Sequence, residues 1–86
     1  MTANSYSGNI NTADEFVTVE SVATGENFSG FTASSTYSMY VSDNVEFKVG
    51  DAVIPAYAGE RFTYTAGADD LYIRTQSSCT LSILEN

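Results

Sequence analysis

The fold of this chain is decided by one short stretch, VEFKVGDAVI at residues 45–54. Apolar residues at positions 45, 47 and 49 alternate with charged residues at 46 and 48, which is typical of a strand with one buried face. Gly50 and Asp51 suit a two-residue hairpin turn in which glycine takes a positive φ. The returning strand at residues 52–54 meets Pro55, which must end it or place it at a sheet edge because proline has no N–H to donate. The stretch therefore predicts an antiparallel hairpin.

The same alternation continues on both sides of this hairpin, from Phe16 to the C-terminus. No segment shows a helical period. The sequence therefore predicts an all-β domain, either a small antiparallel β-sandwich or a barrel of six to eight short strands, with a meander as the simplest strand order. Besides the hairpin, we expect strands over residues 16–22, 28–32, 37–41, 60–65, 71–74 and 79–83, joined by turns rich in Gly, Asp, Asn and Ser.

Residues 1–14 differ in composition from the rest of the chain. They consist mostly of Ser, Asn, Thr, Gly and Ala, with Tyr6 and Ile10 as sizeable apolar side chains. So little apolar surface does not offset the entropy of ordering the segment. We expect a flexible N-terminal arm over residues 1–14, or an ordinary frayed terminus, ahead of a single domain at residues 15–86. An arm that orders against a neighbouring subunit would use Tyr6 and Ile10 as its anchors.

The net charge of the chain limits the classes of partner that it can bind. Three Lys and Arg residues against eleven Asp and Glu residues give a formal net charge of −8. Such a surface repels phosphate backbones and anionic membranes, so we expect no direct nucleic-acid partner and no membrane partner. No apolar run approaches the roughly 20 residues of a membrane span. The N-terminus also has no leader-like apolar run, which predicts synthesis and residence in the cytosol.

The usual catalytic residues are scarce. The chain has no His and one Cys, and nucleophilic catalysis by Ser or Cys normally needs a neighbouring base. Cys79 shares an apolar face with Leu81 and Ile83, which favours a buried structural thiol. The acidic residues lie mostly in turns, where they ordinarily form the turn and aid solubility. We expect no enzyme activity, no cofactor and no metal, with a calcium site at Asp69 and Asp70 or at Asp43 and Asn44 as the weaker alternative.

The aromatic content points to association. The chain has 86 residues, including six Tyr and five Phe, and a domain of this size is commonly stabilised by disulfides, a metal or oligomerisation. Tyr40 and Tyr72 lie on the polar faces of their strands and Tyr57 lies in a loop. These rings are candidates for a partner surface or a sugar platform, or they are simply isolated exposed rings. Arg61 and Arg74 also project from polar faces, where they bind an acidic partner or balance acids across strands.

Three segments follow one another in the C-terminal half: IPAYAGERF at residues 54–62, LYIRT at 71–75 and TLSILE at 80–85. Together they resemble the end of many small virion structural proteins of tailed bacteriophages. In those proteins a strand leaves a Pro/Ala/Gly turn, a YIRT-like strand follows, and the chain closes on a TLSILE-like strand. The resemblance implies a non-enzymatic structural component, either a head decoration (cement) protein or a capsid-attached fibre, often trimeric and with an N-terminal arm that clasps the shell.

The leading hypothesis is therefore a capsid decoration protein on the outer surface of a phage head, synthesised in the host cytoplasm. Its expected partners are the major capsid protein of the same virion and further copies of itself in a homotrimer. The alternative is a carbohydrate- or receptor-binding β-module of a phage tail or fibre, which would use Tyr40, Tyr72 and the acidic turns. The candidate partner-contact residues are Tyr6, Ile10, Tyr40, Tyr57, Arg61, Tyr72 and Arg74.

Overall fold

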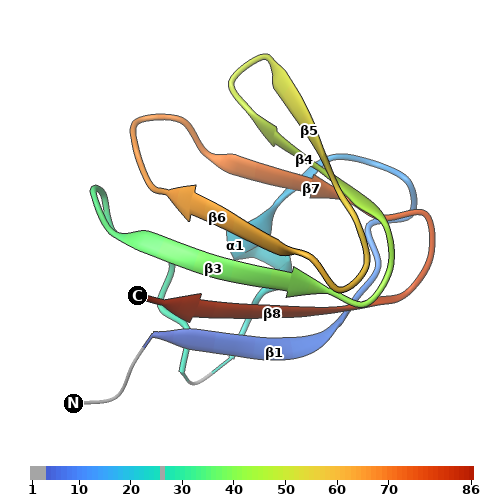
Figure 1. Ribbon diagram of the computed structural model, residues 1–86, viewed down its shortest axis with the longest axis horizontal. Helices are drawn as coiled ribbons and strands as arrows, with labels where there is room; N and C mark the ends of the chain where they lie inside the picture. The colour runs from blue at the N-terminus through green and yellow to red at the C-terminus, as the bar shows by residue number, and fades with distance from the viewer. Residues whose placement is uncertain (1–3, 26) are drawn as a thin grey trace.

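In a computed structural model, which describes residues 4–25 and 27–86, the chain forms two four-stranded antiparallel sheets (Figure 1). Sheet A has the strand order β1-β8-β3-β6, and sheet B has the order β2-β7-β4-β5. The prediction of a small all-β sandwich is confirmed. The elements are β1 (Ser5–Ile10), β2 (Val17–Thr18), α1 (Val19–Val22), β3 (Thr36–Val41), β4 (Val45–Val49), β5 (Ala52–Ala56), β6 (Arg61–Thr65), β7 (Leu71–Arg74) and β8 (Cys79–Glu85).

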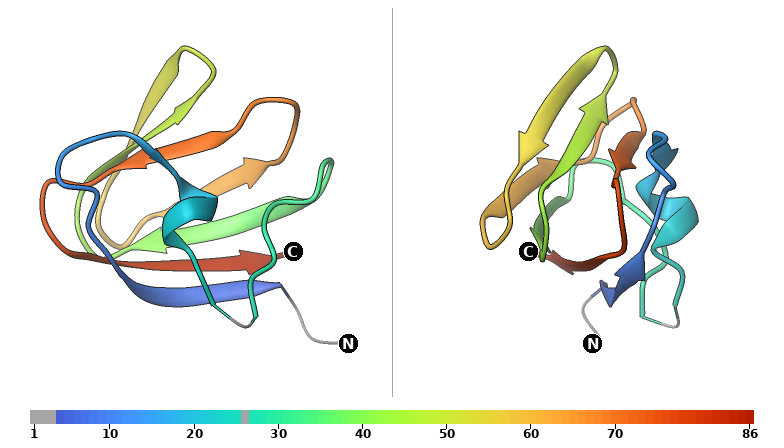
Figure 2. Two further views of the ribbon diagram at one scale, coloured as in Figure 1. Left: turned by 180° about the vertical axis from the view of Figure 1, so that it is seen from behind. Right: turned by 90° about the vertical axis from the view of Figure 1, so that its right-hand side faces the viewer.

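The strand order is that of a jelly roll rather than a meander. The chain crosses repeatedly from one sheet to the other, and among the described strands β4 and β5 are the one pair adjacent in both sequence and sheet. Eight strands that cross between two sheets in this way form the double Greek key of a jelly roll. The end-on view of Figure 2 shows the two layers curling around a common interior. The simplest strand order was therefore wrong, because sequence patterning does not encode which strands pair.

Inward-facing residues of both sheets fill the interior. In sheet A the register aligns Tyr6, Ile83, Met39 and Phe62 in one row across all four strands. Phe47 of sheet B is fully buried and stacks on Phe62, with ring centroids 4.2 Å apart. Burying a large apolar side chain contributes about 1.5–3 kcal/mol, so this shared core is what holds the sheets face to face.

The hairpin at residues 45–54 forms as predicted. Val49 pairs with Ala52 across the turn, and Gly50 has a φ of +57°. β5 is the outer strand of sheet B. Pro55 therefore lies on an edge, where its missing N–H leaves no ladder hydrogen bond unmade.

The N-terminal segment differs from the expected arm over residues 1–14. Residues 5–10 form β1, which pairs with β8 from Ser5 opposite Leu84 to Ile10 opposite Cys79; residues 1–3 lie outside the described part of the chain. Ile10 is 5% exposed and Tyr6 packs against the core, so both side chains serve the interior of this chain. Main-chain hydrogen bonds to β8 satisfy the backbone of this polar segment, which its side chains alone would not order. The sandwich begins at Ser5 rather than at residue 15.

The predicted strand at residues 16–22 is divided. β2 stops at Thr18, and the single turn α1 follows, contrary to the expectation of a chain without helix. Ser21 Oγ donates to the Thr18 carbonyl at 2.7 Å, and Ala23 N–H donates to the Val19 carbonyl at 2.8 Å. This turn buries Val19 completely, and α1 packs against β7 on the side seen from behind in Figure 2. Within the described residues, no helix has the length and apolar character needed to cross a membrane.

The predicted strand at residues 28–32 is replaced by a loop that carries aromatic rings into the core. Phe28 makes an isolated bridge, and Gly30 has a φ of +101°, which breaks extended structure. The Phe31 ring meets Phe28, Tyr37 and Tyr64 edge-to-face, with centroids 5.3, 4.8 and 5.2 Å apart. Such edge-to-face pairs contribute about 0.5–1.5 kcal/mol beyond the area they bury. The alternation in this segment therefore reflects ring packing, not sheet pairing.

A substitution at Ile10 tests whether residues 5–10 form a core strand or a loose arm. We expect Ile10→Ala to lower the free energy of unfolding by about 2–5 kcal/mol, the usual cost of a large-to-small change in a core. The matched control is Val53→Ala, at a residue that is 47% exposed, which should change stability by about 0.5 kcal/mol or less. Urea unfolding followed by circular dichroism measures both. If both variants lost the same small amount of unfolding free energy, Ile10 would belong to a loose arm and not to the core.

Tyr64 should make stability depend on alkaline pH. Burial raises the pKa of its hydroxyl, a backbone hydrogen bond at Gly67 opposes part of this rise, and the nearby carboxylates of Asp70, Glu20 and Asp69 add to it. The folded state therefore holds this proton more tightly than the unfolded state, whose pKa is about 10. The resulting stability is present below that pH and is lost as pH rises through the folded pKa. We expect the decline measured by urea unfolding above pH about 10 to be shallower in Tyr64→Phe; an identical decline in both proteins would contradict this.

Candidate functional site

The outer face of sheet A is broad and nearly uncharged. The residues that alternate with its buried rows point outward from all four strands. Most of them are Ser, Thr or Asn, and the exceptions are Tyr40, Arg61 and Leu84. We call this surface the hydroxyl face; it comprises Ser5, Ser7, Asn9, Thr36, Ser38, Tyr40, Arg61, Thr63, Thr65, Thr80, Ser82 and Leu84.

The small polar side chains of the hydroxyl face bond to one another across strands. Thr80 Oγ1 donates to Asn9 Oδ1 at 2.8 Å, and Thr36 and Thr65 share a hydroxyl hydrogen bond at 3.1 Å. These bonds keep the hydroxyls close to the sheet and partly satisfied. The result is a flat, ordered polar surface above which only longer side chains rise.

Three longer side chains rise together from this surface. Tyr40 on β3 lies directly opposite Arg61 on β6, and Leu84 on β8 is the diagonal neighbour of Tyr40. Tyr40 is 46% exposed, Leu84 is 50% exposed, and Arg61 is exposed. The hydroxyl face includes no Asp or Glu, although the chain carries eleven. Its single formal charge is the Arg61 guanidinium.

The outer face of sheet B has a different character, with charges packed on an aromatic ring. Lys48 Nζ and Arg74 Cζ lie 5.5 and 4.8 Å from the centroid of the Phe16 ring. Arg74 also pairs with Glu46, its cross-strand neighbour, and its Nε lies 3.8 Å from Asp14 Oδ1. Arg74 therefore balances acids across strands, one of the two roles expected for it.

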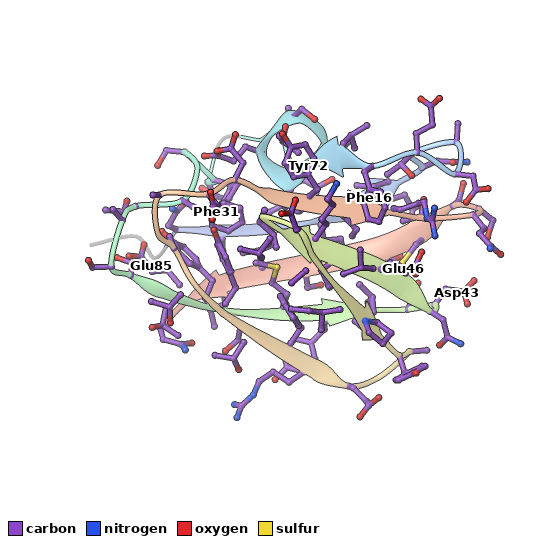
Figure 3. The ribbon with its side chains drawn as sticks, turned by 90° about the horizontal axis from the view of Figure 1, so that it is seen from above. Phe16, Phe31, Asp43, Glu46, Tyr72 and Glu85 are labelled. Carbon is purple, nitrogen blue, oxygen red and sulfur yellow. The ribbon has the colours of Figure 1, made fainter. Side chains whose placement is uncertain are left out.

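The structure separates several of the expected contact residues. Tyr40 and Arg61 lie on sheet A, whereas Tyr72 and Arg74 lie on the opposite outer face, that of sheet B. β6 and β7 belong to different sheets, so Arg61 and Arg74 do not come together as they would if their strands paired. Tyr72 is half-buried and lies near Phe16 along β7 (Figure 3). A single surface built on Tyr40 and Tyr72 is therefore excluded.

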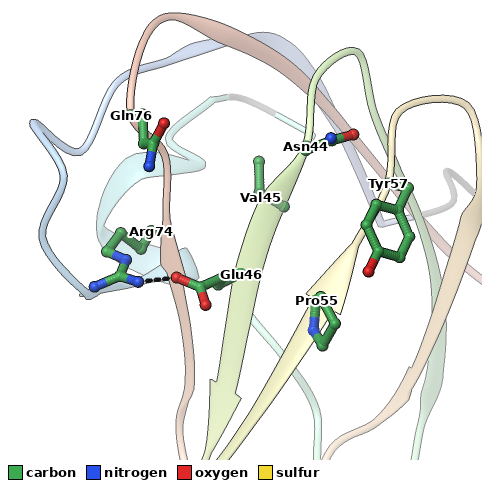
Figure 4. A pocket seen from close by; sticks show the side chains of 7 residues that line it. All are labelled: Asn44, Val45, Glu46, Pro55, Tyr57, Arg74 and Gln76. Atoms are coloured by element: carbon green, nitrogen blue, oxygen red, sulfur yellow. Dashed lines mark hydrogen bonds and ion pairs between the residues drawn. The ribbon is translucent and has the colours of Figure 1, made fainter.

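A groove of about 330 Å³ opens at one end of the outer face of sheet B (Figure 4). Pro55, Glu46 and Arg74 form one row of its floor, as direct cross-strand neighbours on β5, β4 and β7. A second row lies two residues away along each chain segment, just beyond the strand ends, where Asn44, Tyr57 and Gln76 line the same groove. We call this the sheet B groove; it is lined by Asn44, Val45, Glu46, Pro55, Tyr57, Arg74 and Gln76.

The sequence pointed to some of these residues and missed others. It singled out Tyr57 and Arg74 as contact residues and Asn44, with Asp43, only as a weaker calcium alternative, and it did not identify Pro55 or Gln76 as members of a site. One signal was available in the sequence: Gln76 lies two residues after Arg74, and Pro55 lies two residues before Tyr57. That signal becomes a site only when β4, β5 and β7 are known to lie side by side.

The remaining chemistry is sparse in the part of the chain that the structure describes. Cys79 is a free thiol and is 2% exposed, as expected for a structural residue. Across residues 4–25 and 27–86, no three acidic or Cys side chains converge as a set of metal ligands. Thr12 and Thr75 are buried and bond to each other's main chain, which fixes the segment after β1 against the end of β7.

Comparison with known proteins informs the fold. No family model matches this chain, and no curated protein matches it. Among solved structures, the chain is similar to a de novo designed double-stranded β-helix determined by solution NMR. The two share 12% sequence identity and a TM-score of 0.68, over 96% of this chain and 99% of the designed one. At this identity the likeness shows the fold alone, and it agrees with the jelly-roll strand order.

The Glu46–Arg74 pair should contribute little to stability. Both side chains are more than a third exposed, and ion pairs at such sites typically contribute about 0–1 kcal/mol. We expect Glu46→Gln to lower the free energy of unfolding by less than about 1 kcal/mol, and by less still at high salt. Urea unfolding at two salt concentrations tests this, with exposed Glu60→Gln as the control. A salt-independent loss above about 2 kcal/mol would show that the pair behaves as a buried one.

Proposed function

We propose that this chain is a non-enzymatic structural protein of a phage virion, which decorates the outer surface of the head by docking through the hydroxyl face. The observation that carries the proposal is the absence of acidic residues from this broad face on a chain with a net charge of −8. Random placement of eleven acids over 86 residues would put about one or two on these twelve positions. Their absence suits a surface that is buried against another protein.

The residues on the hydroxyl face suit a protein partner. Interface cores are depleted in charged residues, and Tyr and Arg are over-represented among the side chains that dominate binding energy. Tyr40 and Arg61 form such a pair on β3 and the edge strand β6, with Leu84 of β8 beside Tyr40. The surrounding Ser and Thr hydroxyls are small and can hydrogen-bond to a partner. Arg61 further favours a carboxylate at the matching point of the partner.

The rest of the molecule supports an exterior position. Several acids lie in loops, such as those at Asp43, Asp51 and Asp69, and Glu46 lies on the outer face of sheet B. A negative surface resists contact with packaged nucleic acid and keeps particles dispersed. The jelly roll hosts unrelated functions, so it supports the proposal only as a rigid frame. The resemblance of residues 54–62, 71–75 and 80–85 to phage virion proteins supplies the virion setting.

Docking is tested by mixing the purified protein with head particles of the encoding phage from which it has been removed. We expect the protein to co-sediment with the particles, to saturate at a fixed ratio, and to reinforce them against heat through many repeated contacts. The double substitution Tyr40→Ser with Arg61→Ser should weaken binding at least tenfold, about 1.4 kcal/mol. Quantitative gels of the pellet measure the bound fraction.

The matched control is Val53→Ser, which removes an apolar side chain of equal exposure, 47% against 46% for Tyr40, from the other sheet. It should bind the particles like the unaltered protein. No co-sedimentation, or mass spectrometry of purified virions that lack this chain, would refute the proposal. If Val53→Ser weakened binding as much as the double substitution, the hydroxyl face would not be the docking surface.

A further inference from the structure

We infer that the sheet B groove is a binding site for a neutral saccharide, with Tyr57 as the platform for the sugar ring. The inference concerns the opposite outer face of the molecule and does not rest on the proposed docking function. It rests on the two rows of side chains that three neighbouring strands bring to one groove (Figure 4).

Three polar side chains of the groove, those of Arg74, Glu46 and Asn44, are held in place before any ligand arrives. Arg74 is fixed by Glu46 and by the face of Phe16, 4.8 Å from its guanidinium carbon. Asn44 Oδ1 accepts the N–H of Ala58 at 3.0 Å, so this side chain acts on a ligand through its Nδ2 donors. Pre-organised donors and acceptors bind a ligand without losing further side-chain entropy.

The loop that carries Tyr57 is also ordered by main-chain bonds. The N–H of Glu60 donates to the Tyr57 carbonyl and the N–H of Gly59 donates to the Val41 carbonyl, each at 3.0 Å. Gly59 has a φ of +82°, which permits this tight turn. Tyr57 is nevertheless 52% exposed, with Pro55 beside it in the groove. An exposed aromatic ring on an ordered main chain is a ready stacking surface.

The chemistry of the groove selects the ligand class. The Arg74 charge is already neutralised by Glu46 and lies near Asp14, so the groove offers no free cation to an anionic ligand in a strongly acidic protein. An apolar ligand would leave the amides and the ion pair without partners, at a cost in desolvation. A sugar satisfies both constraints, because its hydroxyls pair with Asn44, Gln76 and the ion pair while its C–H face packs on the electron-rich ring of Tyr57.

The dimensions suit one sugar residue with neighbours on either side. Ligand pockets hold roughly 300–1,000 Å³, and the groove lies at the small end of that range at about 330 Å³. Two smaller hollows of about 90 and 180 Å³ share residues with it: the first shares Pro55 and Tyr57 and extends to Arg61 of β6, and the second shares Asn44 and Gln76. These hollows offer room for further sugar residues of an oligosaccharide.

The test is titration of the ¹⁵N-labelled protein, followed by NMR, with the methyl glycosides of glucose, galactose, mannose and N-acetylglucosamine. Glycerol serves as a hydroxyl-rich probe that lacks a ring face. We expect at least one glycoside to shift the amide signals of Asn44, Glu46, Tyr57 and Gln76 in a saturable way. Tyr57→Ala should weaken this binding at least tenfold, about 1.4 kcal/mol, whereas Tyr57→Phe, which keeps the ring, should retain most of it.

Two further variants separate a specific site from a general surface effect. Gln76→Ala should weaken binding several-fold by removing an exposed amide, and Val53→Ser should leave it unchanged because Val53 lies on the same strand as Pro55 but outside the groove. The inference is overturned if no glycoside shifts these signals, if glycerol shifts them equally, or if Tyr57→Ala binds like the unaltered protein. Unchanged spectra outside the groove establish that each variant remains folded.

Discussion

The structure depends on the pairing of β8 with two strands at once. This C-terminal strand lies between β1 and β3, so its main-chain donors and acceptors are satisfied on both sides by segments far away in the sequence. Its register also determines which residues are buried, because a shift of one residue would exchange Leu81 and Ile83 for Ser82 and Leu84 on the core side. The core of sheet A and the hydroxyl face are therefore two consequences of the same register.

The two sheets divide the chemistry of the surface between them. Sheet A presents uncharged hydroxyls with one arginine, whereas sheet B presents Lys48 and Arg74 packed on Phe16, with Arg74 also paired with Glu46. Asp43 and Glu46 lie at one end of the sandwich and Phe31 and Glu85 at the other (Figure 3). No residue of the hydroxyl face lines the sheet B groove itself, so a partner on the hydroxyl face leaves that groove open; only the smaller hollow beside it shares Arg61 with the hydroxyl face.

The local sequence pattern predicts the observed element correctly where the pattern and the tertiary role of the residues agree. The alternation at residues 45–49 and the glycine at position 50 specify a hairpin whatever else the chain does. The pattern predicts the wrong element where contacts with distant segments decide the conformation. Ser, Gly and Asn in residues 5–10 have little intrinsic tendency to order, and β8 supplies the ladder that they need. Phe28 and Phe31 suggested a strand, but their rings pack from a loop onto Tyr37 and Tyr64.

The sequence by itself determined the all-β class, the positions of most strands, the buried face of each and the scarcity of catalytic groups, because these follow from alternation and composition within a few residues. Only the tertiary structure decided which strands lie side by side. Pairing is a non-local choice, since the same alternating segments fit a meander or a jelly roll equally well. For that reason Tyr40 joined Arg61, Arg74 joined Glu46, and Tyr57 joined Asn44 and Gln76 only when the chain had folded.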